Sequence, residues 1–301
     1  MEEGKPNSSA IGSAMLRAAH LLWDNPPKIF EDTLAMRLSG CESDAALRAE
    51  LDRIQSEIAR STGPDFAVTM LRSLTAMTVM RSRYVEDEVD QAVGRGVSQY
   101  VILGAGLDSF AYRRPDLAKV LRVFEVDHPT AQAWKRSRLR ETGIELPLNL
   151  NLVPVDFEKD SLIDNLRANG YQTDAAGLFS WLGVTMYLTP DAVFSTLRTT
   201  ATLAPGTEII FQYTVPKELC DEESQRLLAV VMPVSTARGE PWQSSFVPAT
   251  LSEQVSKLGF AEVSDLGPEE ARARYFADRT DGLRPPTSEH YMRARVGPHS
   301  N

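Results

Sequence analysis

The spacing of hydrophobic residues changes near residue 95. Before that point, apolar positions recur every three or four residues, as in amphipathic helices, with breaks at Asn25-Pro26-Pro27 and Gly40. A long helix is predicted from about 66 to 93, ended by glycine. Beyond it, short runs of β-forming residues alternate with helical segments. We therefore expect residues 1–95 to form a helical cap together with the helix that precedes the first strand.

The region from 96 to 301 is predicted to be an α/β domain. The predicted strands are 100–104, 121–126, 151–155, 177–183, 207–213, 260–266 and 289–296. The helices predicted between or after these strands cover 129–142, 159–169, 190–203 and 248–258. Regular alternation of this kind predicts a mostly parallel sheet. We expect the last two strands to close the sheet as an antiparallel pair. Residues 216–245 interrupt the alternation, and we expect them to form a lid.

A glycine-containing turn follows the first predicted strand. The β-forming run Tyr100–Leu103 leads into Gly104-Ala105-Gly106, and about twenty residues later a second strand ends in Asp127. In a doubly wound sheet, consecutive strands bring such a loop and such a carboxylate together at the carboxyl edge. A carboxylate at this position suits the two hydroxyls of a ribose. The pattern predicts a site for an adenosine-containing cofactor, although a purely structural turn would use the same glycines.

The residues after the turn discriminate between cofactors. A dinucleotide fingerprint requires a third glycine where this chain has Ser109, and Asp108 adds a negative charge where a diphosphate would lie. Anions favour the positive end of a helix without a neighbouring acid. A cofactor without phosphate avoids the conflict, and S-adenosylmethionine (SAM) is the common one.

Four motifs together carry a resemblance to a known family. They are Leu103-Gly104-Ala105-Gly106-Leu107-Asp108-Ser109 with Arg113-Arg114, Glu125-Val126-Asp127-His128-Pro129, Val155-Asp156-Phe157 and Met186-Tyr187-Leu188-Thr189-Pro190. They look like those of the leucine carboxyl methyltransferase family, in particular its bacterial branch of SAM-dependent O-methyltransferases linked to polyketide and other secondary metabolism. The motifs occur in family order, and the resemblance covers nearly the whole chain from about Ala10. It implies a class I methyltransferase: a Rossmann-like, mostly parallel seven-stranded sheet with an N-terminal helical cap.

One arginine interrupts an apolar stripe on the helix before the first strand. Met77, Val85, Val89 and Val93 share a helix face with Arg81. Burying an unpaired guanidinium costs on the order of several kcal/mol. Arg81 either extends its charged end to water while its stem packs, or it binds an anion. The resemblance implies the second role, with the methionyl carboxylate of SAM as the anion.

Three further residues are candidate cofactor ligands. Arg17, in the first helix, is a second candidate for the same carboxylate. Asp156 and Phe157 end the third strand, where the acid could accept from an adenine amino group and the ring could face the purine. The alternative for Asp156 is a helix N-cap, since an aspartate before a helix accepts from free backbone amides.

The segment from 179 to 188 departs from the family. Better-known members carry a glutamate five residues before the tyrosine, whereas this chain has Leu182. The role of that glutamate is therefore not transferred, and the class of substrate stays open. Trp181, Met186 and Tyr187 are candidates to line the substrate pocket, with core packing as the alternative for each.

Charge, hydropathy and cysteine content exclude several classes of binding partner and site. A net charge of −9 argues against binding to nucleic acid, which requires clustered Lys and Arg. The chain shows neither a long apolar run for a membrane span nor the pattern of a secretory leader. Cys41 and Cys220 are too few for a disulfide framework, and their neighbours have no metal-ligand spacing. We expect a cytoplasmic enzyme with free thiols and no metal site.

These observations predict methyl transfer from SAM to a carboxylate or hydroxyl of a small molecule. A carboxylate acceptor needs no base at pH 7, whereas a hydroxyl would need one, and His20, His128, Tyr187 and Tyr213 are candidates. No residue is identified as catalytic from the sequence. Two alternatives remain: a nicotinamide-dependent oxidoreductase on the same type of sheet, and a SAM-binding paralogue without activity.

Overall fold

The computed structural model describes residues 8–157 and 159–298, and in them a sheet with strand order β3-β2-β1-β4-β5-β7-β6. The strands from β3 to β5 are parallel to one another, and β7 is antiparallel to both β5 and β6. The mostly parallel sheet and the antiparallel final pair are thus confirmed. The strands are β1 (Gln99–Leu103), β2 (Arg122–Asp127), β3 (Leu150–Pro154), β4 (Leu178–Trp181), β5 (Glu208–Thr214), β6 (Phe260–Leu266) and β7 (Glu289–Val296).

The helices follow the predicted pattern with few exceptions. They are α1 (Ser8–Trp23), α2 (Ala35–Ser39), α3 (Asp44–Thr62), α4 (Pro64–Gly94), α5 (Phe110–Arg113), α6 (Pro129–Glu141), α7 (Leu162–Ala168), α8 (Pro190–Ala201), α9 (Glu222–Ala237), α10 (Pro248–Ser256) and α11 (Pro268–Tyr275), with single 3₁₀ turns η1 (Pro115–Leu117), η2 (Thr185–Tyr187) and η3 (Lys217–Leu219). Helix α7 begins later than predicted, because the Ser161 hydroxyl accepts from the Asp164 N–H and caps it there. Helix α11 was not predicted, because it buries only Ala271 and has no apolar stripe.

Two hydrophobic layers cover the sheet. Alternate residues of each central strand point to opposite faces, so Val101 and Leu103 join one layer while Tyr100 and Ile102 join the other. The first layer is completed by apolar residues of α7, α8 and α10. The second is completed by α4, α5 and α11. The long helix α4 therefore packs directly on the sheet and carries its own residues towards the carboxyl edge.

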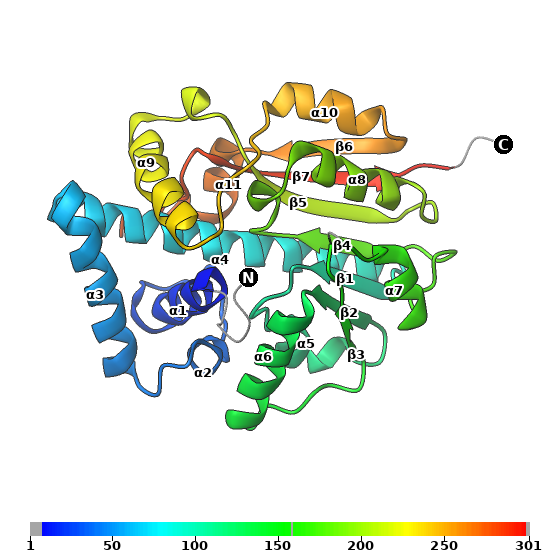
Figure 1. Ribbon diagram of the computed structural model, residues 1–301, viewed down its shortest axis with the longest axis horizontal. Coiled ribbons are helices and arrows are strands. Elements are labelled where there is room, and N and C mark those ends of the chain that lie inside the picture. The colour runs from blue at the N-terminus through cyan, green and yellow to red at the C-terminus, as the bar shows by residue number, and fades with distance from the viewer. Residues whose placement is uncertain (1–7, 158, 299–301) are drawn as a thin grey trace.

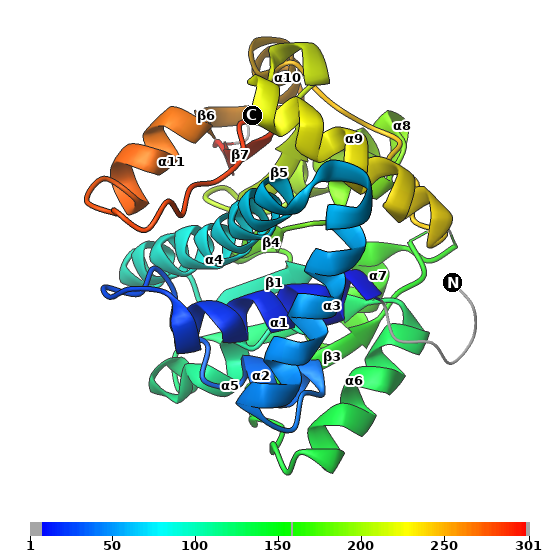
Figure 2. The same ribbon diagram turned by 90° about the vertical axis from the view of Figure 1, so that its left-hand side faces the viewer.

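The N-terminal helices and α9 gather at the carboxyl edge of the strands. In Figure 1, α1, α3 and α9 lie at the left, towards which β5 points, and Figure 2 shows the same three helices in front of the sheet. The insertion between β5 and α10 contains η3, α9 and a loop. None of the helices in the described part of the chain is long and apolar enough to span a bilayer.

Strand register aligns the ends of β1, β2 and β4. Leu103 pairs with Val126 on one side and with Trp181 on the other. The residues that follow these three positions therefore emerge together at one edge. They are Gly104, Asp127 and Leu182.

Candidate functional site

The turn after β1 requires both of its glycines. Gly104 and Gly106 have φ angles of +68° and +46°, the left-handed region that disfavours a Cβ. A Cβ at Gly104 would lie 2.5 Å from Cγ2 of Val184. The N–H groups of Gly104 and Ala105 both donate to the Val126 carbonyl, at 2.8 and 3.1 Å. The loop is thereby held against the end of β2.

The Asp127 carboxylate lies beside this loop, in the arrangement that the sequence predicted. Its Oδ2 accepts from the Gly106 N–H at 2.6 Å, and its Oδ1 accepts from the His128 N–H at 2.7 Å. Burial raises the pKa of Asp127, and these two hydrogen bonds oppose the rise. The carboxylate is thus oriented by backbone groups, which leaves its remaining lone pairs for a ligand.

Arg81 is half-buried and has no carboxylate partner among the described residues. Its Nη2 donates to Ser13 Oγ at 3.0 Å, and its Nη1 donates to Gln212 Oε1 at 3.3 Å. Among residues 8–157 and 159–298, no carboxylate forms an ion pair with it. Burial lowers its pKa, as expected for a cation removed from water. The predicted apolar stripe is present, since Val85 and Val89 are 2% and 1% exposed.

Arg17 already has protein partners. Its Nε donates to Asp32 Oδ2 at 2.8 Å, and its Nη2 donates to the Leu107 carbonyl at 2.7 Å. Asp32 Oδ2 also accepts from the Ser109 hydroxyl at 2.7 Å. Burial alone would raise the pKa of Asp32, but Arg17, Arg113 and the Ser109 hydrogen bond lower it below its usual value. This network fastens α1 and the segment around Asp32 to the glycine loop.

Asp156 and Phe157 lie next to Asp127. The N–H of Val155 donates to the Asp127 carbonyl at 2.9 Å, so the two strand ends are adjacent. Asp156 Oδ2 accepts from Lys159 Nζ at 2.6 Å. The N-cap alternative for Asp156 is wrong, because Ser161 caps α7. The Phe157 side chain is 37% exposed at this edge.

Two of the four candidate bases are fully buried and hydrogen-bonded away from a substrate. His20 is 0% exposed, its Nε2 accepts from the Ile29 N–H, and its Nδ1 pairs with Asp24 Oδ2 at 2.7 Å. Tyr213 is likewise 0% exposed and donates to Asp265 Oδ1 at 2.7 Å.

The other two candidates are His128 and Tyr187, and neither is better placed to accept a proton. Nδ1 of His128 accepts from the Thr130 N–H at 3.2 Å, which assigns the proton of the neutral ring to Nε2. Burial raises the pKa of Tyr187, so its hydroxyl stays protonated.

The residues that the sequence offered as pocket-lining candidates lie partly in the hydrophobic core and partly at the carboxyl edge of the sheet. Trp181 is 0% exposed within the main hydrophobic core, so it does not line a pocket. Tyr187 packs edge-on against Trp242 of the insertion, with ring centroids 6.4 Å apart. The insertion is held there by hydrogen bonds from the Gln243 N–H to the Met186 carbonyl at 2.7 Å and from the Ser244 hydroxyl to the Thr185 carbonyl at 2.9 Å. Leu182 packs against the second hydrophobic layer.

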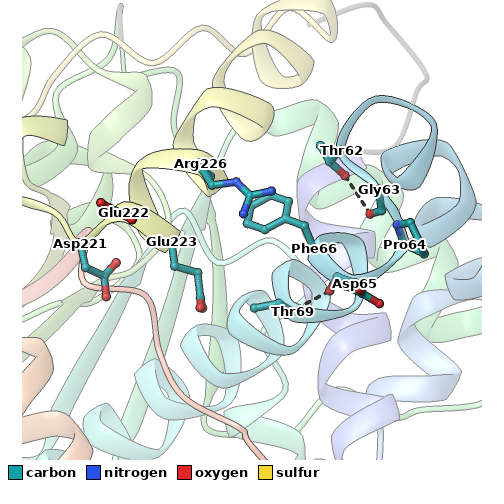
Figure 3. Close-up of a pocket in the computed structure, with 10 residues that line it drawn as sticks. All are labelled: Thr62, Gly63, Pro64, Asp65, Phe66, Thr69, Asp221, Glu222, Glu223 and Arg226. Carbon is teal, nitrogen blue, oxygen red and sulfur yellow. Dashed lines mark hydrogen bonds between the residues drawn. The ribbon is translucent and has the colours of Figure 1, made fainter.

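A pocket of about 690 Å³ lies where the cap meets α9, away from the glycine loop (Figure 3). The Arg226 guanidinium stacks over the Phe66 ring, 4.0 Å from its centroid. The other lining groups include four carboxylates, Asp65, Asp221, Glu222 and Glu223. None of the predicted cofactor ligands lines this pocket. This pocket is therefore separate from the sheet edge at which the candidate cofactor ligands meet.

Ser13 and Gln212 contact Arg81 but were not identified from the sequence. Ser13 lies one helical turn before Arg17, and this spacing could have indicated it. Gln212 is a polar residue within the buried strand β5, where all seven residues are buried. A lone amide in such a strand signals a specific hydrogen-bond partner.

Comparison with known proteins is consistent across sequence and fold. The model of the family described as Leucine carboxyl methyltransferase matches residues 10–201. A Bacillus subtilis (strain 168) protein named as a candidate S-adenosyl-L-methionine-dependent methyltransferase, YktD, is 29% identical over 98% of this chain and 99% of its own. A similarly named protein of Mycolicibacterium gilvum (strain PYR-GCK) is 35% identical over 53% of this chain and 52% of its own.

Among solved structures, a candidate methyltransferase from Thermobifida fusca YX has a TM-score of 0.54 at 18% identity. The match covers 97% of this chain and 96% of that one. At this identity the likeness concerns the fold. Together with the strand order, it identifies the class I methyltransferase-like architecture.

Proposed function

Because the chain belongs to the leucine carboxyl methyltransferase family, we propose that it transfers the methyl group of SAM to an oxygen of a small molecule, with an ionised carboxylate as the acceptor. Methyl transfer from SAM is the activity for which its relatives are named. Oxygen as the acceptor atom, the carboxylate class and a place in secondary metabolism are the further parts of the proposal.

The observation that carries the proposal is the state of Arg81. A half-buried guanidinium without a carboxylate partner among the described residues fits a ligand that brings its own carboxylate. The methionyl part of SAM has one. The loop at Gly104-Ala105-Gly106 and the Asp127 carboxylate are at the same edge, which suits an adenosine group. The residues present therefore fit the cofactor.

Each residue has a stated role in the proposal. Arg81 binds the methionyl carboxylate, and Arg17 is retained as a second contact, with two of its nitrogens already donating to protein groups. Asp127 accepts from the ribose hydroxyls. Asp156 accepts from the adenine amino group, and Phe157 packs on the purine. When bound, SAM supplies a sulfonium methyl group that is already electrophilic, so the protein's remaining task is to align the acceptor and exclude water.

None of the four candidate bases, all within the described residues, is well placed to take a proton, and this favours a carboxylate acceptor. His20 and Tyr213 are buried and hydrogen-bonded elsewhere, and neutral His128 has its acceptor nitrogen engaged. The raised pKa of Tyr187 makes it a poor proton acceptor near pH 7. An alcohol or phenol would need a base, whereas a carboxylate is already ionised. The product would then be a methyl ester.

The family to which the chain belongs and the relatives named for SAM dependence argue against the alternative of a nicotinamide-dependent oxidoreductase. A SAM-binding paralogue without activity is the remaining alternative, because Leu182 stands at the position of the family's glutamate. Turnover distinguishes it from an enzyme.

The test is methyl transfer from SAM labelled in its methyl group to matched pairs of acceptors, each an acid and the corresponding alcohol. We expect labelled product with acids, and alkali should release the label as methanol because esters hydrolyse. An alkali-stable product from the alcohols would contradict the carboxylate assignment. Binding of SAM without turnover on any acceptor would support the inactive paralogue.

A further inference from the structure

Gln212 lies between the half-buried guanidinium of Arg81 and the buried acid Glu289. It is 0% exposed on β5, and Glu289, the first residue of β7, is 4% exposed. Gln212 Nε2 donates to Glu289 Oε2 at 2.7 Å, while its Oε1 accepts from Arg81 Nη1 at 3.3 Å. One amide therefore links the guanidinium to the carboxyl group.

The orientation of this amide is determined by its surroundings. Its Oε1 also accepts from the Gly183 N–H at 2.9 Å. A flipped amide would direct its NH₂ group at two donors, the Gly183 N–H and the Arg81 guanidinium, and its oxygen at Glu289. Only the observed orientation gives each group a partner. Gln212 thus presents an acceptor to Arg81 and a donor to Glu289.

The amide also keeps the Arg81 guanidinium and the Glu289 carboxyl group apart. Within residues 8–157 and 159–298, neither Arg81 nor Glu289 forms an ion pair. The other acceptor bonds of Glu289 come from the Thr214 hydroxyl at 3.3 Å and the Ser288 hydroxyl at 3.5 Å. Burial strengthens attraction between opposite charges. Direct contact between Arg81 and Glu289 would neutralise the guanidinium and occupy its donors.

We propose that Gln212 is a positioning residue for cofactor binding, which acts as a neutral spacer: it orients the Arg81 guanidinium and prevents Glu289 from pairing with it. The guanidinium then keeps its charge for the methionyl carboxylate. This inference rests on the proposed function, because it assigns Arg81 to that carboxylate. It adds a requirement on β5 and β7, which carry none of the predicted cofactor ligands.

The test compares two ligands by calorimetry, SAM and 5′-methylthioadenosine, which contains the adenosine thioether but no amino-acid group. Gln212→Glu places a carboxylate against Arg81 with little change in shape. We expect the Kd for SAM to rise about tenfold or more, as for loss of a charge-assisted hydrogen bond. The Kd for 5′-methylthioadenosine should change less than about threefold, since this ligand does not use Arg81.

Two further variants make the result decisive. Gln212→Met introduces a neutral side chain of similar length, and it replaces Gln212→Glu in the test if that variant does not fold. The loss of SAM affinity in Gln212→Met should be smaller, but it should again be selective for SAM. Gln99→Glu is the matched control, because Gln99 is a 1% exposed amide on β1 that bonds to the backbone of Gln172, far along the strand from the site. If it folds, its ratio of the two Kd values should equal that of the wild type.

The outcomes separate the two proposals. If wild-type protein binds neither ligand, the proposed function fails and this inference fails with it. If wild-type protein binds SAM but the folded Gln212 variants lose both ligands equally, or lose neither, the spacer role alone is wrong. A selective loss of SAM in either variant supports it.

Discussion

Gly183 gives the Arg81 guanidinium the space that it occupies. A Cβ at Gly183 would lie 2.5 Å from Arg81 Nη1 and 3.2 Å from its Cζ. Gly183 also has a φ angle of +68° and directly follows Leu182, at the edge where β4 ends. The glycine therefore serves both the turn after β4 and the placement of the cation.

Gly183→Ala should displace the guanidinium. We expect the affinity for SAM to fall by about 1–2 kcal/mol, in addition to a stability cost of about 1 kcal/mol for the left-handed backbone. Gly96→Ala is the matched control, because Gly96 has a φ angle of +92° and open space where its Cβ would lie. Calorimetry of both variants measures the change in SAM affinity, and thermal unfolding measures the change in stability. Equal SAM affinity in Gly183→Ala and Gly96→Ala would show that the contact between Gly183 and Arg81 does not matter for binding.

Arg81→Met should abolish binding to the methionyl carboxylate while keeping most of the stem packing. We expect SAM affinity to fall by about 2 kcal/mol or more, the scale of a charged hydrogen bond. Stability should change little, because the charge that is removed is partly desolvated and has no acid to pair with among the described residues. 5′-Methylthioadenosine should bind both proteins almost equally. If the variant is largely unfolded but its folded fraction binds SAM as tightly as the wild type does, Arg81 is a structural residue.

Asp127→Ala should weaken SAM binding by about 1.5–3 kcal/mol through loss of a charge-assisted hydrogen bond. The variant also leaves the Gly106 and His128 N–H groups without their side-chain acceptor, so folding has to be checked by circular dichroism. In contrast to Arg81→Met, 5′-methylthioadenosine should be weakened as much as SAM, since both ligands carry the ribose. Unchanged affinity in a folded variant would remove Asp127 from the site.

Asp32→Asn should destabilise the fold by about 3 kcal/mol, because Arg17 and Arg113 lose a buried anion. The pKa of Asp32 is lowered in the folded state, so the unfolded chain binds its proton more tightly. The stabilisation by this carboxylate is therefore complete above its unfolded pKa, near 3.8, and is lost as the pH falls through the folded pKa. Urea unfolding at pH 7 and at decreasing pH should show the difference between wild type and variant shrinking on acidification.

The control for Asp32 is Asp116→Asn. Asp116 also pairs with an arginine, Arg114, at 2.8 Å, but its side chain is 58% exposed. An exposed pair of this kind contributes about 0–1 kcal/mol. If Asp32→Asn lowers the free energy of unfolding no more than the control does, the network between α1 and the glycine loop does not stabilise the fold.

Local patterns predicted the elements and the ligand-facing loop. Hydrophobic spacing predicted all seven strands and the helix from 66 to 93, because burial on a face imposes a period on the residues themselves. The juxtaposition of Gly106 and Asp127 also followed, since consecutive parallel strands end at one edge. The same logic identified Arg81 as an exception on its helix face. It could not predict α11, which has no such period.

Only the tertiary structure decided which polar groups meet. Asp32 and Ser109, or Gln212 and Arg81, are 77 and 131 residues apart, and no spacing in the sequence relates them. His20 is a mixed case: its partner Asp24 stands at helical i,i+4 spacing, whereas the bond from the Ile29 N–H to its Nε2 depends on how the chain folds back after the helix. Such pairs depend on how whole elements pack against one another, whereas the hydrophobic periodicity of each element is present in its own sequence. The chain by itself thus determined the scaffold and the loop, and the packing of distant elements decided which side chains remain available to a ligand.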